Sequence, residues 1–222
     1  MDTFIENGFK IDYHNKFTKS EIRDFQNFWN NLPIDKYILG DIKYRHRRYS
    51  KLSYNFQNKE LEFSSSSYFQ ESQHNSLYGG EFRDFEPVLP SFLENPIFLK
   101  CLNKDFLFFL SHELIKYKTY EIGIHQIRTV SCSSIESEVT PEGIHKDGHF
   151  VFAIHFIDRK NVSGGITKLY NNKKEMISSI TLDTFGQTML IEDNKLYHQV
   201  TPIKSLCENT VGYRDVLIIE FY

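Results

Sequence analysis

Residues 141–148 read PEGIHKDG and place an imidazole, His145, two positions before a carboxylate, Asp147. Side chains at positions i and i+2 of an extended segment point to the same side. One strand or strand end can therefore direct both groups toward a single point. His-x-Asp also arises by chance, and for this dipeptide alone a surface turn with a solvated histidine and aspartate is the preferred interpretation.

Later features of the chain add separate conditions to this stretch. Gly164 and Gly165 open a strand, residues 195–202 read KLYHQVTP and supply His198, and Arg214 is a fixed cation on an otherwise apolar final strand. Two histidines and one carboxylate on one face of an ion leave the opposite positions open, which is typical of non-haem Fe(II) oxygenases. The arginine is suited to a bidentate grip on a carboxylate. The ordered set favours a functional site over a surface turn.

This set resembles the Fe(II)/2-oxoglutarate-dependent dioxygenases, and more narrowly the bacterial branch that hydroxylates free amino acids, typified by isoleucine dioxygenase. The resemblance covers roughly residues 37 to 221. Asp147 keeps the carboxylate at its metal position, so the halogenase variant, which loses that ligand, is disfavoured. Besides the triad, the resemblance rests on YFQ at 68–70, Asn75, GGEFRDFEP at 79–87, HQIRT at 125–129, residues 141–155 and NVSGG at 161–165.

The resemblance implies the cofactors and the residues that bind them. Fe(II) is expected on His145, Asp147 and His198, with 2-oxoglutarate and O2 as cosubstrates and succinate and CO2 as products. Arg214 is expected to bind the distal carboxylate of 2-oxoglutarate, rather than to form a surface ion pair with Asp215 or Glu220. His155 has the same strand parity as Val151 and Ala153, so it is expected to point inward and touch the cosubstrate.

A free amino acid requires a cation for its carboxylate and an anion for its ammonium group. Arg128, on the strand before the motif, and Glu142, three residues before the first ligand, are the expected pair. Two alternatives stay open: Glu142 could only shape its turn, and Arg128 could face solvent or bind 2-oxoglutarate. Further candidates from the family-like blocks are Arg83, Gln70 and Asn75.

Length and composition fit one domain, residues 1–222, with a sizeable core. The 15% aromatic content suits a β-rich interior. A net charge of −3 gives no reason to expect nucleic acid or membrane, and no apolar run approaches the roughly 20 residues of a membrane span. The start lacks a signal-peptide pattern, and three scattered cysteines form no disulfide framework, so a cytoplasmic location is expected. The oligomeric state stays open.

Helical patterns come first along the chain. A capping box at 18–21 predicts a helix that ends at Pro33, and Asn95 followed by Pro96 predicts another to about residue 117, with a second possible start near Asn103. Residues 38–56 predict one or two strands. Their RHRR run at 45–48 could be an acid-binding patch, but a solvated strand face is the expectation. Short strands are predicted at 120–130, 150–157, 165–170, 175–182, 188–191, 197–201 and 211–222.

We therefore predict an α+β fold with a mainly β core. A double-stranded β-helix, or jelly roll, is expected over residues 119–222, with a helical and strand part, residues 1–118, packed on it. The expected activity is hydroxylation of an aliphatic C–H of a free L-amino acid. Two alternatives are the same cofactors with desaturation, cyclisation or epimerisation, and a non-catalytic cupin-like metal-binding module. Arg214 discriminates against the module, which would not need a 2-oxoglutarate carboxylate site.

Overall fold

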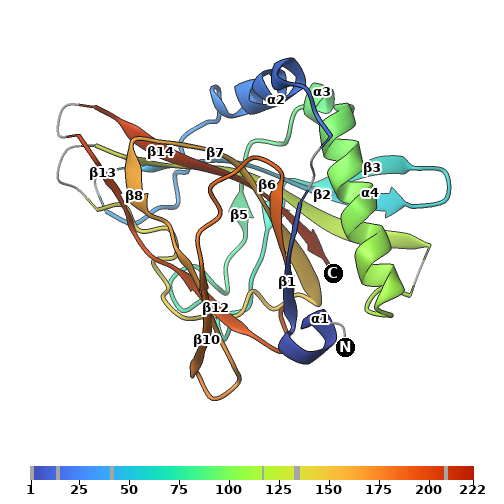
Figure 1. The fold of residues 1–222 in the computed structure, drawn as a ribbon. Coiled ribbons are helices and arrows are strands. Elements are labelled where there is room, and N and C mark those ends of the chain that lie inside the picture. The colour runs from blue at the N-terminus through green and yellow to red at the C-terminus, as the bar shows by residue number, and fades with distance from the viewer. Residues whose placement is uncertain (1–2, 14–15, 41–42, 117, 133–135, 208–209) are drawn as a thin grey trace.

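A seven-stranded antiparallel sheet forms the centre of the protein, in the order β1-β11-β7-β14-β6-β2-β3 (Figure 1). The computed structural model describes residues 3–13, 16–40, 43–116, 118–132, 136–207 and 210–222. The strands of this large sheet are β1 (Phe9–Tyr13), β2 (Arg45–Asn55), β3 (Glu60–Ser65), β6 (Thr119–Ser131), β7 (Val151–Lys160), β11 (Gln187–Glu192) and β14 (Gly212–Phe221).

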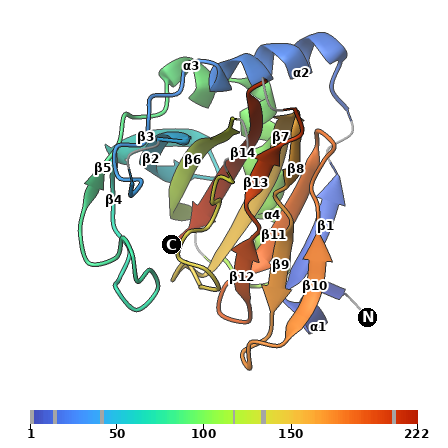
Figure 2. The same cartoon turned by 90° about the vertical axis from the view of Figure 1, so that its left-hand side faces the viewer.

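Three smaller sheets complete the β structure (Figure 2). An apolar cluster that includes Ile154 of β7 and Leu169 of β9 connects the large sheet to the three-stranded one. A bridge between His145 and His198 attaches the PEGIHKDG stretch to β12. The smaller sheets consist of β10 (Met176–Ile180), β9 (Thr167–Tyr170) and β12 (Tyr197–Val200); β8 (Val162–Gly164) and β13 (Ile203–Ser205); and β4 (Ser67–Tyr68) and β5 (Arg83–Asp84).

Helices pack on the other face of the large sheet (Figure 1). The Thr18 capping box begins the first long helix as predicted, and the Asn95 side chain caps the second by accepting from the backbone of Ile97 at 2.9 Å. That second helix is continuous through Asn103 and ends at Ser111, earlier than expected, because the chain turns to a positive φ at Glu113. The helices are α1 (Thr3–Asn7), α2 (Lys19–Gln26), the 3₁₀ turn η1 (Asn27–Trp29), α3 (Pro90–Leu93) and α4 (Pro96–Ser111).

Strand alternation divides the large sheet into a helix-covered face and an inner face. On β14, Leu217 and Ile219 pack with the helices, whereas Val216 and Ile218 line an inner cavity. Aromatic side chains dominate the helix side, where each fully buried Phe contributes roughly 1.5–3 kcal/mol. The inner face carries a second apolar cluster, which includes Ile154 and Val216, and beside it the polar and charged groups that line the cavity.

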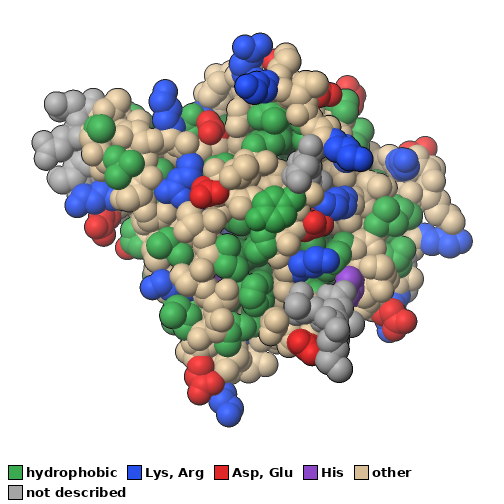
Figure 3. Space-filling model, in the orientation of Figure 1, with side chains coloured by type: hydrophobic (Ala, Val, Ile, Leu, Met, Phe, Trp, Pro, Cys, Tyr) green, Lys and Arg blue, Asp and Glu red, His purple; other side chains and the backbone are tan. Residues whose placement is uncertain are grey.

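The division predicted at residue 118 is not a boundary in the sheet. β2 pairs with β6 along its whole length, and β1 pairs with β11. All seven strands predicted after residue 118 are present, whereas β1, β3, β4, β5, β8 and β13 were not predicted. In the part of the chain that the structure describes, none of the helices has the length and apolar character needed to cross a membrane. Basic and acidic side chains are interspersed on the face that Figure 3 shows.

Candidate active site

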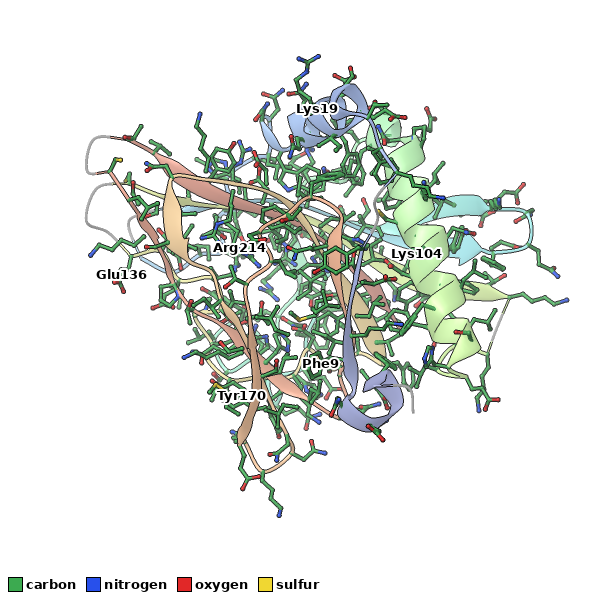
Figure 4. The ribbon with its side chains drawn as sticks, viewed as in Figure 1. Phe9, Lys19, Lys104, Glu136, Tyr170 and Arg214 are labelled. Atoms are coloured by element: carbon green, nitrogen blue, oxygen red, sulfur yellow. The ribbon has the colours of Figure 1, made fainter. Side chains whose placement is uncertain are left out.

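A cavity of about 110 Å³ opens on the inner face of the large sheet. One wall comes from strands β2, β6, β7 and β14, and a second from β12 and the stretch 139–147. The third wall is the segment from β4 to β5, which contributes Tyr68, Gln70 and Arg83. Arg214 lies in the interior, where Figure 4 labels it.

His145, Asp147 and His198 come together at this cavity. One ligand atom from each lies within 4.8 Å of the others, and all three residues line the cavity. The Asp147 carboxylate oxygens lie 3.4 Å from His145 Nε2 and 3.5 Å from His198 Nε2. Donors on one face of an ion with bonds of roughly 2 Å have comparable spacing. The set could therefore hold one metal ion with open positions toward the cavity.

The three groups have pKa values that favour a cation among them. Burial raises the pKa of Asp147, but His198 and His145 outweigh it and hold that carboxyl well below its usual range. Burial and His145 lower the pKa of His198 to about 4, so its imidazole is neutral. Burial lowers the pKa of His145, but Asp147 and Glu142 outweigh it and raise it to about 9. Metal binding must therefore release a proton from His145.

Groups outside the triad hold its members in place. His145 Nδ1 lies 2.9 Å from the carbonyl oxygen of Gly143, which leaves Nε2 for a metal. The backbone N–H groups of Asp147 and Gly148 donate to the Asp193 carboxylate at 3.1 and 2.8 Å. Gln70 Nε2 donates to Asp147 Oδ1 at 3.3 Å. Asp193 lies in a turn 46 residues after Asp147, and no motif of the sequence marked it as part of the site.

Arg214 is a buried cation whose Nε has no hydrogen-bond partner among the described residues. Burial and the nearby Arg159 lower its pKa to about 10. Gly165 makes room for it, because a Cβ there would lie 2.9 Å from Arg214 Cδ, and the φ of Gly165 is +69°. The alternative, a surface ion pair with Asp215 or Glu220, is absent among the described residues, where Asp215 pairs with Arg128 and Glu220 with two histidines. Arg214 is suited to bind an anion in the cavity.

A second buried carboxylate, Glu220, lies near the metal motif. Its oxygens lie 2.7 Å from His125 Nε2 and 3.3 Å from His149 Nε2. Burial lowers the pKa of His149, but Glu220 outweighs it and raises it to about 9. Tyr68 and Tyr222 also donate to Glu220, at 3.3 and 2.9 Å. Glu220 is thus satisfied by its own partners, and no ion pair joins it to Arg214 among the described residues.

Four of the expected substrate residues line the cavity. Glu142 Oε1 lies 3.3 Å from His145 Nε2, and its Oε2 is buried without a hydrogen-bond partner among the described residues. Gln70 Oε1 accepts from Asn75 Nδ2 at 3.1 Å and from an Arg83 N–H at 2.9 Å. Gln70 therefore uses its amide to connect Arg83 with Asp147, and Asn75 orients Gln70.

Two expected site residues lie on the helix side of the sheet, away from the cavity. His155 Nε2 lies 2.7 Å from Asp105 of α4, and Ile154 lines the cavity in its place, so the expected inward direction was wrong. Arg128 Nε and NH2 each donate to Asp215 at 2.7 Å, and the guanidinium also contacts Asn30 near η1. Strand alternation explains both corrections. The cavity is lined by Ile154 on β7 and by His125 and Ile127 on β6, so His155 and Arg128 point to the opposite face.

The prediction that the RHRR run at 45–48 forms a solvated strand face was also wrong. Arg45 and Arg47 are only 7% and 6% exposed and line the cavity. His46 and Arg48 contact the backbone oxygens of Leu32 and Pro87 outside it. Alternation on β2 therefore directs two of the four basic side chains inward.

Comparison with known proteins agrees with this geometry. The profile of the family described as 2OG-Fe dioxygenase matches residues 26–220. The chain belongs to the 2OG-Fe dioxygenase family. Its cofactor is Fe(II), and its cosubstrates are 2-oxoglutarate and O2. The dioxygenase is therefore an enzyme, and a metal-binding module without turnover is disfavoured.

Two curated relatives and one solved structure define its neighbourhood within the family. L-isoleucine-4-hydroxylase of Bacillus thuringiensis is 31% identical over 85% of this chain and 80% of its own. The 3(1)-hydroxy-L-isoleucine 4-dioxygenase of Pantoea ananatis (strain AJ13355) is 27% identical over 90% of this chain and 81% of its own. The crystal structure of IDO from Bacillus thuringiensis superimposes with a TM-score of 0.82 at 26% identity and covers 99% of this chain and 95% of that one.

Proposed function

We propose that the dioxygenase hydroxylates an aliphatic C–H of a free L-amino acid and releases succinate and CO2. The names of its two relatives, which act on isoleucine and hydroxyisoleucine, support this substrate class. The observation that carries the proposal is a single cavity lined by the His145–Asp147–His198 cluster, the buried cation Arg214 and the carboxylate Glu142.

In this proposal His145, Asp147 and His198 hold Fe(II). The donor set suits it, because two imidazoles and a carboxylate on one side leave room for a chelating cosubstrate and O2. Bound iron supplies the oxidising chemistry, while the chain positions the reacting C–H. Arg214 binds the distal carboxylate of 2-oxoglutarate, and its unpartnered Nε supports this role.

Glu142 binds the ammonium group of the substrate. It faces the cavity beside His145, and its Oε2 has no other partner among the described residues. A carboxylate in that state is costly to bury unless a cation joins it. Glu142 therefore orients the amino acid with its α-carbon close to the metal motif.

We also propose the wider setting of this activity. The large sheet and the smaller sheets form the two halves of a jelly roll, and residues 1–222 act as one domain. A cytoplasmic location is part of this proposal, and the free thiols of Cys101, Cys132 and Cys207 support it, because such thiols suit a reducing compartment.

A mass-spectrometric screen tests the proposed function. Each of the twenty L-amino acids is incubated with the dioxygenase, Fe(II), 2-oxoglutarate and ascorbate in air. We expect one or more amino acids to gain 16 mass units, with one succinate for each product. A loss of two mass units would indicate desaturation or cyclisation, and an unchanged mass with inverted chirality would indicate epimerisation. If no amino acid increases succinate formation or is altered, the proposed function is wrong.

A further inference from the structure

Two buried arginines line the cavity without a carboxylate partner. Arg47 of β2 and Arg83 of β5 are 6% and 4% exposed, and each has a buried Nε without a hydrogen-bond partner among the described residues. Arg45, their neighbour, differs because its Nε lies 2.8 Å from Asp35. No ion pair joins Arg47 or Arg83 to a carboxylate in the part of the chain that the structure describes.

Aromatic rings and neutral groups hold both arginines in fixed positions. Arg47 lies 4.4 Å from the ring centre of Phe85 and 4.9 Å from that of Tyr68. Arg83 lies 5.0 Å from the Tyr68 ring and 5.3 Å from that of Tyr78. An Arg47 N–H also donates to His125 Nδ1, and an Arg83 N–H to Gln70 Oε1. Both guanidinium groups therefore meet at Tyr68, ordered before any ligand binds.

Like charges in such a place are unfavourable without an anion. Burial, followed by the charge of Arg47, lowers the pKa of Arg83 to about 10, which leaves Arg83 cationic at neutral pH. Buried charges in proteins are paired or bound to a ligand. The pair therefore has the composition of an anion site, and two forked donors suit a carboxylate.

Resting on the proposed function, we infer that Arg47 and Arg83 together bind the α-carboxylate of the amino-acid substrate. Gln70 connects Arg83 to Asp147 through two hydrogen bonds, so an anion bound here lies beside the metal motif. The distal carboxylate of 2-oxoglutarate already has Arg214, and its other end chelates the metal. The remaining carboxylate in the reaction is that of the substrate, with Glu142 for its ammonium group.

A comparison of an amino acid with its amide tests this site without turnover. The dioxygenase is loaded with Fe(II) and saturating 2-oxoglutarate under argon, and thermal unfolding is followed against each of the twenty L-amino acids. The best ligand is then compared with its α-carboxamide, which keeps the side chain and ammonium group. In the native protein we expect the amide to bind roughly 100-fold more weakly.

Substitutions at the two arginines should remove this discrimination. Arg47→Gln and Arg83→Gln are expected to lower the acid-to-amide ratio at least roughly tenfold and to leave 2-oxoglutarate affinity unchanged. Arg48→Gln is the matched control, because Arg48 lies next on β2, contacts Pro87 and should keep the native ratio. If a glutamine variant does not fold, Arg47→Lys is measured in its place, because lysine keeps the charge but lacks the forked N–H donors of arginine.

Two results would overturn the inference. One is a native acid-to-amide ratio in the arginine variants, and the other is a loss of 2-oxoglutarate affinity in its place. If no amino acid binds the native protein, the proposed function fails, and acetate in the presence of 2-oxoglutarate then tests the pair itself. If acetate stabilises the native and Arg48→Gln proteins but not Arg47→Gln, the arginine pair is a carboxylate site. Equal stabilisation of all three proteins would exclude such a site.

Discussion

At the scale of single residues, the charged groups of the cavity fall into two kinds, those with partners in the protein and those without. Glu220 pairs with His149 and is also contacted by His125 and two tyrosines, while Glu142 and Arg214 keep atoms without partners among the described residues. Groups that the protein satisfies by itself contribute to its structure, and unsatisfied buried groups indicate where ligands bind. This distinction favours the proposed ligand-binding roles of Arg214 and Glu142, whereas Arg128 and His155 have their partners on the helix side.

Arg214→Ala is expected to weaken 2-oxoglutarate binding. Loss of a buried charge-assisted contact costs about 2–5 kcal/mol, so the KM for 2-oxoglutarate should rise at least roughly tenfold while iron content stays near native. Steady-state succinate assays measure this. Arg128→Ala is the control: it breaks the Arg128–Asp215 pair and should lower stability without changing that KM. A raised KM in the Arg128 variant only would move the role to Arg128.

Glu142→Gln is expected to weaken amino-acid binding more than 2-oxoglutarate binding. The change removes the charge that faces the substrate ammonium group but keeps the size of the side chain. Succinate should still form, with less than one hydroxylated product for each succinate. Product and succinate are measured together by mass spectrometry. Unaltered amino-acid kinetics in this variant, or a native enzyme that accepts only substrates without a free α-amine, would contradict the role.

At the scale of elements, a buried His–Asp pair joins α4 to the large sheet. His155 Nε2 lies 2.7 Å from Asp105, and its Nδ1 lies 2.8 Å from Thr188. Burial lowers the pKa of His155, but Asp105 outweighs it and raises it to about 10. A histidine whose pKa rises on folding contributes stability that is fully present below its unfolded value, about 6.5, and lost as pH rises through the folded value.

The free energy of unfolding should therefore fall between about pH 7 and pH 10. Asp105→Asn removes the charge that raises the His155 pKa, so it should flatten this fall and cost about 3 kcal/mol at pH 7. Urea unfolding across the pH range measures both effects. Lys104→Gln breaks the surface pair between Lys104 of α4 and Asp12 of β1 and should leave the slope unchanged. Parallel curves for the native and Asp105→Asn proteins would exclude the pair as the cause.

At the scale of the whole molecule, periodicity and capping predicted most elements. The Thr18 and Asn95 caps and the strands after residue 118 depend on local sequence, which a single chain displays. Short strands such as β8 and β13 depend on pairing with distant partners, and no local pattern marks them. β1 does alternate apolar residues with Lys10 and Asp12, but the pattern covers only five residues at the edge of the sheet, too few to mark a strand by themselves.

The site was predictable where residue type and order carried the signal. His145, Asp147 and His198 were identified as a set, and the structure brings them within one cluster. The faces of β2, β6 and β7 were not predictable, because each of these strands is covered on both sides and polar residues occur on both. Arg47 and Arg128 were therefore assigned to the wrong faces, and His155 was placed inward although Ile154 has the inward parity.

An anaerobic Fe(II) titration with a parallel succinate assay tests the metal site most directly. The native dioxygenase should bind one Fe(II) per chain and form succinate in the presence of its amino acid. Asp147→Ala should weaken Fe(II) binding by more than about 100-fold and abolish substrate-dependent succinate, because it removes a charged ligand. Asp12→Asn, a surface carboxylate on β1, should match the native protein. Native iron binding and near-normal turnover in Asp147→Ala would contradict the assignment of the triad.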